Sequence, residues 1–144
     1  LRIRANQTGI CSIEFMNQPG SANHSPNQSP NPHLKSAIRE LDLYFAGKLS
    51  TFKTPTAAKG TPFQEIVWIE LQKLLAGSTI HYGAIAERIG NPKASRAVGL
   101  ANNRNPLPIL VPCHRVVGKS GSLIGYAGEL WRKEWLLKHE GALI

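Results

Sequence analysis

Cysteines, acidic residues and long apolar runs are all scarce in this sequence of 144 residues. The only two cysteines, Cys11 and Cys113, allow at most one disulfide, which excludes a disulfide-stabilised scaffold. No apolar run approaches the roughly 20 residues of a membrane-spanning helix, which excludes an integral membrane protein of that kind. Arg2 and Arg4 are followed by no apolar core of a secretory signal. We therefore expect a cytoplasmic protein with reduced thiols.

The shortage of acidic residues is uneven along the chain. Seventeen Lys and Arg against nine Asp and Glu give a net charge of +8, and residues 88–128 hold six basic residues and no acidic one. A basic segment within a folded pattern favours a polyanionic partner, nucleic acid before an anionic membrane surface. A solvated face that only aids solubility is the less favoured alternative that charge alone leaves open.

The first 60 residues have the pattern of a small α/β lobe. Alternating apolar and polar residues predict a half-buried strand at 9–16, with Cys11 as a structural thiol on its apolar side. Residues 17–32 are rich in Asn, Gln, Pro and Ser and predict a loop. Apolar residues at helical spacing predict a helix over 34–45, and residues 48–60 have the composition of a linker. We predict one domain at 1–60 and a second at 61–144.

The second domain opens with a helix start signal. Thr61, Pro62 and Gln64 have the form of a capping box with proline at the first helical position. The helix is expected to end before Gly77 and to bury an apolar stripe, which comprises Phe63, Ile66, Val67, Leu71, Leu74 and Leu75.

Two further short helices predict a helix-turn-helix. The first runs from about 82 to 89, and after Gly90 the second runs over roughly 92–103 with Asn91 as its cap. The second helix has small apolar residues on its packing side (Ala94, Ala97, Val98, Ala101). Its outer side carries basic residues and a glycine that leaves room for close approach (Lys93, Arg96, Gly99, Leu100, Asn103). Many helix pairs of this kind bind no DNA, but the basic outer side favours DNA.

Chemistry is concentrated in residues 107–115. A strand-like apolar run, 107–111, leads into Pro112, Cys113, His114 and Arg115. A nucleophilic cysteine needs neighbours that favour its thiolate, and a histidine and an arginine supply them. The alternative is a buried cysteine beside a surface histidine, because neighbours on an extended strand point to opposite faces. The histidines and cysteines show no paired zinc-ligand spacing, so we predict no metal site.

The sequence resembles the O6-alkylguanine-DNA alkyltransferase family, especially its bacterial stand-alone members. Three motifs carry the resemblance over residues 61–141: Pro112-Cys113-His114-Arg115-Val116, Gly90-Asn91-Pro92-Lys93-Ala94-Ser95-Arg96-Ala97-Val98-Gly99 with Asn105-Pro106, and Lys133-Glu134-Trp135-Leu136-Leu137-Lys138-His139-Glu140-Gly141. The first 60 residues match only in outline. The resemblance implies an α+β protein, with a shortened ribonuclease-H-like N-terminal lobe and a mainly helical C-terminal lobe that contains the helix-turn-helix.

The resemblance also implies roles for individual residues. Cys113 would take the alkyl group from guanine O6 irreversibly, in a single turnover. His114 would act as its base through an ordered water, and Glu140 would orient the imidazole, so that a thiolate–imidazolium pair lowers the pKa of Cys113 below its reference of about 8.5. Tyr82 would help to rotate the nucleotide and protonate the leaving guanine.

The remaining implied residues bind DNA or line the alkylguanine pocket. Arg96 would fill the gap left by the flipped base, and Asn105 would link the recognition helix to the active-site strand. Asn91, Lys93, Gly99 and Lys119 complete the expected DNA-binding set. Arg115, Tyr126 and Ala127 complete the expected pocket and hinge.

Several positions depart from the family pattern. Glu129 stands where a second glycine is usual, Ala127 stands where some members have serine, and Asn102-Asn103 replace more hydrophobic or basic residues. Cys11, His24 and His33 do not reproduce the zinc ligands of some relatives, which supports the prediction of no metal.

The resulting expectation is DNA repair by direct reversal with no cofactor, performed by a monomer on double-stranded DNA that contains O6-alkylguanine. The sequence leaves O4-alkylthymine open as a further substrate. Two alternatives compete. A non-enzymatic alkyltransferase-like damage-binding protein would lack the cysteine, which argues against it. A transcription factor that uses only the helix-turn-helix would explain the basic face but not Cys113, His114 and Glu140.

Overall fold

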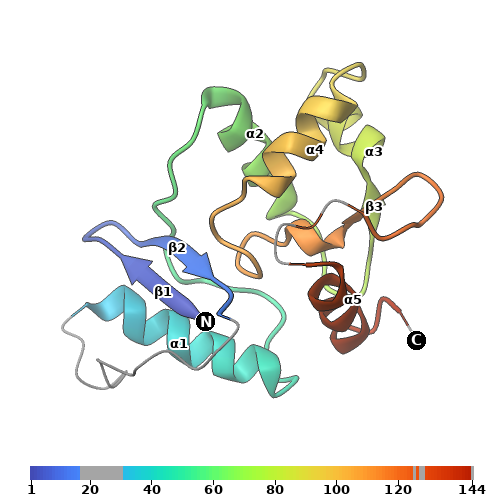
Figure 1. Ribbon diagram of the computed structural model, residues 1–144. Helices are drawn as coiled ribbons and strands as arrows, with labels where there is room; N and C mark the ends of the chain where they lie inside the picture. Colours follow the sequence, from blue (N-terminus) through green and yellow to red (C-terminus); the bar gives the residue numbers. More distant parts are fainter. Residues whose placement is uncertain (17–30, 125, 127–128, 144) are drawn as a thin grey trace. The chain divides into compact units, whose positions relative to one another are not determined.

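The protein, analysed as a computed structural model, divides into two compact units, Leu1–Lys59 and Gly60–Ile144 (Figure 1). The structure describes residues 1–16, 31–124, 126 and 129–143. Most of the predicted loop at 17–32 therefore lies outside the described residues. Helices and short strands occur together in the described part, and the predicted α+β class is confirmed.

A β-hairpin and one helix build the first unit. β1 (Arg2–Ala5) and β2 (Ile10–Glu14) pair antiparallel, and the register shifts between Arg4 and Ala5. β2 confirms the predicted strand, whereas β1 was not predicted because it is short and carries two arginines. α1 (Pro32–Phe45) confirms the predicted helix; Asn31 caps its first turn by accepting from the backbone of His33 and Leu34.

Residues 48–60 are not a free linker, contrary to the prediction. Ile10 donates its N–H to Pro55 O at 2.9 Å, and Ala57 donates to Ile10 O at 2.8 Å. Gly9 permits this approach, because a Cβ there would lie 2.4 Å from Pro55 O. The buried carboxylate of Glu40 on α1 accepts the N–H groups of Lys53 and Thr54, both at 2.8 Å. The segment is thus held in the first unit by both β2 and α1.

α2 (Pro62–Leu71) opens the second unit with the predicted capping box, in which Thr61 and Gln64 bond reciprocally. The helix is shorter than predicted, and the apolar stripe is partly wrong. Ile66 and Leu75 are 50% and 73% exposed, whereas Trp68 is buried and donates its indole N–H to Ala101 O at 2.9 Å. Apolar spacing along α2 could not predict the burial of Trp68, because that burial depends on α4, which packs against α2.

α3 (Tyr82–Arg88) and α4 (Ser95–Asn103) pack against each other, and α4 also packs against α2 (Figure 1). α4 starts later than predicted: Ala94 is its N-cap, no side chain caps it, and Asn91 lies in the preceding turn. Val98 and Ala101 are buried as predicted, but Ala97 is exposed.

The predicted strand at 107–111 is wrong. Val111 N–H bonds to Leu107 O at 2.9 Å and Ile109 has φ of +77°, so this apolar run is a buried turn. It is followed by the 3-10 helix η2 (Cys113–Arg115) and by β4 (Val116–Val117), which pairs parallel with β3 (Ile80–His81). α5 (Leu130–His139) follows. In the part of the chain that the structure describes, no helix has the length and apolarity to cross a membrane.

Candidate active site

Cys113 lies at the first position of η2 and is 4% exposed. Its N–H bonds to Val111 O at 2.7 Å, and Arg115 N–H bonds to Pro112 O at 3.1 Å, which winds the chain into a tight turn. Neighbouring side chains point to opposite faces only in an extended strand. Because Cys113 and His114 lie in a helical turn, this argument does not separate them. Cys113, His114 and Arg115 are all buried together.

His114 and Glu140 form a buried pair. Nε2 of His114 lies 2.8 Å from Oε2 of Glu140, and both side chains are at most 1% exposed. Glu140 stands at the C-cap of α5, but its carboxylate turns inward to η2. With its Nε2 proton directed to this carboxylate, the neutral imidazole keeps Nδ1 as its basic nitrogen. The alternative of a solvent-facing histidine beside a buried cysteine is therefore excluded.

Arg115 holds the other edge of the Glu140 carboxylate. Its Nε and Nη2 donate to Oε1 and Oε2 at 2.9 and 2.8 Å, and its Nη1 donates to Leu74 O at 2.7 Å. The guanidinium is buried and bonds to the turn that follows α2. We therefore assign Arg115 to fixing Glu140, and it is not among the residues that line the cavity described below.

Burial governs the protonation of Cys113 and His114. It raises the pKa of the Cys113 thiol, an effect only partly opposed by a hydrogen bond from Asn105 and the positive charge of Lys133. It also lowers the pKa of His114, although Glu140 opposes this. Both directions are opposite to those expected for the predicted thiolate–imidazolium pair with a lowered thiol pKa. The reason is desolvation, which residue adjacency in a sequence does not reveal.

Two asparagines from the end of α4 and the following turn support the nucleophile. Asn105 donates to Val111 O at 2.8 Å and accepts from Leu107 N–H at 2.9 Å, which shapes the turn before Cys113. Asn102 is 1% exposed and donates to Cys113 O at 3.3 Å. Asn102 is therefore turned into the core, whereas Asn103, predicted on the outer side of the helix, is exposed.

Tyr82 and Lys133 meet at one backbone carbonyl. Tyr82 Oη donates to Ile124 O at 3.0 Å, and Lys133 Nζ donates to the same oxygen at 2.7 Å and to Val116 O at 2.5 Å. Lys133 was not predicted as a site residue. A signal for it exists in the sequence: it lies three and four residues before Leu136 and Leu137, so it falls on the buried stripe of α5.

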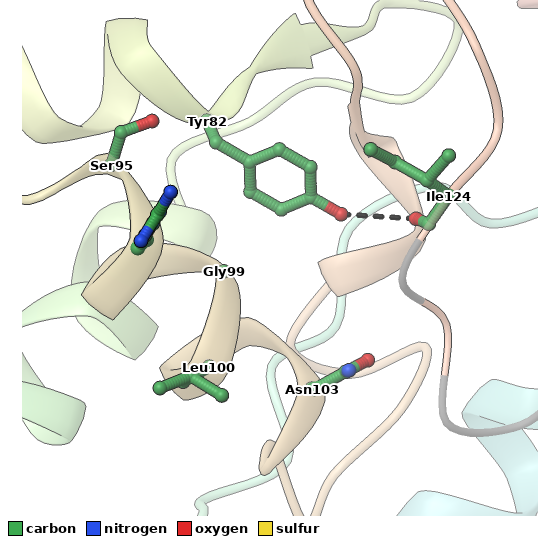
Figure 2. Close-up of a pocket in the computed structure, with 7 residues that line it drawn as sticks. Tyr82, Ser95, Gly99, Leu100, Asn103 and Ile124 are labelled. Atoms are coloured by element: carbon green, nitrogen blue, oxygen red, sulfur yellow. Dashed lines mark hydrogen bonds between the residues drawn. The ribbon is translucent and has the colours of Figure 1, made fainter.

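A cavity of about 470 Å³ opens between α4, Tyr82 and Ile124 (Figure 2). It is lined by Tyr82, Ser95, Arg96, Gly99, Leu100, Asn103 and Ile124. Figure 2 shows Tyr82 reaching across toward Ile124, with Gly99 and Leu100 on the facing helix. Three predicted site residues, Tyr82, Arg96 and Gly99, thus share one apolar cavity, and Cys113 does not line it.

The other predicted residues are distributed around this region. Asn91, Lys93 and Lys119 are exposed and do not line the cavity. Tyr126 is half-buried, and its carbonyl accepts from Glu129 N–H at 3.2 Å. Ala127 lies outside the described residues. Glu129 has φ of +80°, a conformation that favours glycine, which fits the glycine expected there. Within the described ranges, no cluster of three or more His, Cys, Asp or Glu side chains could hold a metal ion.

Comparison with protein families gives two matches. Residues 62–142 match the model "6-O-methylguanine DNA methyltransferase, DNA binding domain", and residues 1–58 match "6-O-methylguanine DNA methyltransferase, ribonuclease-like domain".

Individual relatives agree with these matches. A methylated-DNA–protein-cysteine methyltransferase of Shigella flexneri is 54% identical over 112 residues, which cover 77% of this chain but only 64% of that protein. One of Methanosarcina barkeri is 53% identical over 139 residues, covering 96% of this chain and 88% of that protein. A solved structure, the Mycobacterium tuberculosis OGT in complex with DNA, aligns with a TM-score of 0.84 at 40% identity and covers 96% of this chain and 84% of that one.

Proposed function

Since the chain belongs to the 6-O-methylguanine DNA methyltransferase family, we propose that it repairs DNA by moving the alkyl group of O6-alkylguanine to Cys113. The single observation that carries this proposal is the buried His114–Glu140 pair, 2.8 Å apart, directly beside the buried Cys113 in the chain. This arrangement provides a nucleophile, a base with one free basic nitrogen, and a carboxylate that orients the base.

The proposed step moves one proton and one alkyl group. The Cys113 thiol gives its proton to Nδ1 of His114 through solvent while its sulfur attacks the alkyl carbon; the S–C bond forms as the C–O6 bond breaks. Tyr82 protonates the leaving guanine, and the proton held by His114 restores the phenol. Once His114 has taken this proton, the carboxylate of Glu140 at Nε2 stabilises the charge of the imidazolium.

On the DNA side, we propose that α3 and α4 form the helix-turn-helix and that α4 faces the duplex. O6 of a paired guanine is obstructed, so the nucleotide must leave the stack, at a cost of about a few kcal/mol that is smallest for a damaged base. Arg96 would fill the gap, with Asn91, Lys93 and Lys119 on the phosphates. Gly99 leaves room at the cavity wall for close approach.

Tyr126 and Ala127 would close over the alkylated base, on the segment before α5. Cys113 is 4% exposed, so an alkyl group reaches its sulfur only when neighbouring residues shift. We propose residues 61–144 as the domain for DNA binding and alkyl transfer and residues 1–60 as its smaller partner lobe. The free thiols of both cysteines suit the cytoplasm, and a monomer is the proposed working form.

The test is the intact mass of the protein after incubation with a duplex that contains O6-methylguanine. One methyl group per molecule is expected, with no further transfer at excess substrate, because no group in the site breaks a thioether. Cys113→Ser should bind the duplex and gain no mass, while Cys11→Ser should react as the unchanged protein does. Multiple turnovers, or methylation of Cys113→Ser, would refute the proposal.

A further inference from the structure

His81 caps α3 with a nitrogen of its ring. Its Nδ1 accepts the N–H of Ala84 at 3.2 Å, and its backbone is extended, with φ of −95° and ψ of 159°. A β-carbon added at Gly83 would lie 3.5 Å from the same nitrogen, so the ring lies against the first turn of the helix. The hydrogen bond satisfies one of the donors that the first turn cannot pair internally.

The turn that this cap stabilises contains Tyr82. α3 has only seven residues, begins at Tyr82 and has glycine at its second position, so length and local propensity contribute little to its stability. From this turn Tyr82 reaches across the cavity, where its hydroxyl donates to Ile124 O at 3.0 Å (Figure 2). The place of the Tyr82 hydroxyl therefore depends on a turn that the histidine cap stabilises.

The backbone of His81 is held independently of its side chain. β3 pairs parallel with β4, with His81 opposite Val117, and β4 directly follows the η2 turn that contains Cys113. Loss of the cap is therefore expected to loosen the start of α3 and to leave β3 in place beside the nucleophile.

A histidine cap differs from the usual caps because protonation removes its acceptor. Serine, threonine and asparagine keep their acceptor oxygen when the pH falls. Nδ1 of an imidazolium carries a proton and cannot accept, and its positive charge lies at the end of a helix that favours negative charge. Histidine is also the side chain whose charge ordinarily changes between about pH 5 and 8. The cap of α3 thus exists only in the neutral form of His81.

The surroundings of His81 leave its proton to the solvent. The ring belongs to an exposed residue that takes part in no ion pair with any residue that the structure describes. β4 contributes two valines. The charged or titratable groups on the helices packed at β3 and α3 are Tyr82, Glu87 and Arg88 on α3, Glu65 and Glu70 on α2, and Arg96 on α4. Of these, Glu70 pairs with Lys73 and Arg88.

We propose that His81 is a positioning residue for Tyr82 and makes alkyl transfer sensitive to acid. Neutral His81 caps α3 and holds Tyr82 at Ile124 O; protonated His81 releases the first turn. This inference rests on the proposed function, in which Tyr82 protonates the leaving guanine. It adds a loss of rate in acid that is separate from the titration of His114, the proposed base.

The first experiment measures single-turnover methyl transfer from a saturating duplex that contains O6-methylguanine, at about pH 8 and about pH 5.5. His81→Asn keeps an acceptor at both pH values. It should match the unchanged protein within about twofold at pH 8 and react about fivefold faster at pH 5.5, the factor that loss of a cap ordinarily makes in an equilibrium constant. His81→Ala, which cannot cap, should be slower than His81→Asn by about this factor at both pH values.

His33→Asn is the matched control, since it makes the same change in the first unit, where Nε2 of His33 lies 3.1 Å from Gln7 O. Its rate relative to the unchanged protein should be the same at both pH values. A rate ratio of His81→Asn to the unchanged protein that does not change with pH would overturn the inference, as would an equal change for His33→Asn.

A second measurement observes the cap without the reaction. In NMR spectra of the full chain, the Ala84 amide and the Tyr82 ring should shift with pH at the midpoint of the His81 imidazole. Both shifts should be absent in His81→Asn. An Ala84 amide or a Tyr82 ring that does not respond while His81 titrates would refute the control of Tyr82 by the cap.

The outcome is separable from the fate of the proposed function. If the unchanged protein gains no methyl group at either pH but the Ala84 and Tyr82 signals follow His81, the function fails and the cap-dependent place of Tyr82 stands. If methyl transfer occurs and neither the rate ratio nor the NMR signals depend on pH, the function stands and the inference fails.

Discussion

At the scale of single residues, Glu140 is the acceptor for two different cationic or potentially cationic groups. Its carboxylate receives His114 Nε2 and two nitrogens of Arg115, all between 2.8 and 2.9 Å and all buried. Arg115 in turn reaches Leu74 O, so the carboxylate is tied to the end of α2 as well. Glu140 therefore stabilises the fold around η2 as well as orienting the histidine.

Glu140→Gln is expected to cost stability and activity together. It leaves the buried Arg115 guanidinium without a counter-charge, and breaking a buried pair in this way lowers the free energy of unfolding by about 3 kcal/mol. Urea unfolding measures this. Glu134→Gln is the control, because its exposed pair with Lys138 should contribute less than about 1 kcal/mol. Equal effects of the two substitutions would contradict the structural role of Glu140.

At the scale of secondary-structure elements, the start of α2 is stabilised by two side chains that bond reciprocally. Thr61 accepts Gln64 N–H at 3.1 Å, and Gln64 returns a bond to Thr61 N–H at 3.0 Å. These bonds satisfy donors that the first helical turn cannot pair internally.

Thr61→Ala should lower the free energy of unfolding by about 1 kcal/mol through loss of this cap. Thr61→Ser keeps the hydroxyl and should retain most of the stability. Both are measured by urea unfolding. If serine and alanine destabilise the protein equally, the threonine methyl group rather than the cap is responsible.

α4 presents Arg96 at the cavity while Val98 and Ala101 anchor the other side of the helix. If Arg96 stabilises the flipped state, Arg96→Ala should slow transfer from duplex DNA at least about tenfold, which corresponds to roughly 1.4 kcal/mol. The reaction of this variant with free O6-benzylguanine needs no flipping. Its rate should therefore stay within about twofold of that of the unchanged protein. Single-turnover rates on both substrates test this.

Arg104→Ala provides the comparison for Arg96, since Arg104 is exposed at the end of α4 and does not line the cavity. It should weaken duplex binding mildly at low salt through loss of a surface charge. Equal losses for Arg96→Ala on duplex and free base would show that Arg96 maintains the site itself.

At the scale of the whole molecule, the buried charge of Lys133 makes the stability depend on pH. Its pKa is lowered from 10.5 to about 8 in the folded protein. Between these values the unfolded chain keeps a proton that the folded chain has lost, so the free energy of unfolding rises with pH. Below pH 8 the folded state carries the full cost of the charge.

The stability of the unchanged protein should therefore rise relative to Lys133→Met between pH 7 and 10. The gain is about 1.4 kcal/mol for each unit of pKa difference that is traversed. Urea unfolding in a Cys113→Ser background measures it without the titration of the thiol. A stability difference that stays constant over this range would show that Lys133 is not desolvated.

The net charge is also a property of the whole molecule, and the structure shows which of the basic residues lie at the surface. Of the six basic residues in 88–128, Arg115 is buried against Glu140, while Arg88, Lys93, Arg96, Arg104 and Lys119 are exposed. The surface available to a polyanion therefore excludes the arginine nearest to the nucleophile.

Features that depend on local patterns and on matching motifs could be predicted from the sequence. Alternation specified β2, apolar spacing specified α1, and the Thr61–Gln64 capping box specified the start of α2, because caps and periodicity act over a few neighbouring residues. The Pro112–Val116 motif identified Cys113 and His114 as the chemical centre, and the motif at the C-terminus supplied Glu140 as the partner that the structure shows.

Only the tertiary structure decided what burial and long-range pairing control. The apolar run 107–111 became a turn because Asn105 and the surrounding core shape it. Residues 53–57 joined the first unit because Ile10 and Glu40 bind them. Lys133 entered the site through folding of α5 onto β4. Desolvation raises the pKa of the Cys113 thiol and lowers that of the His114 imidazole, and it depends on neighbours that exclude water and are distant in the sequence.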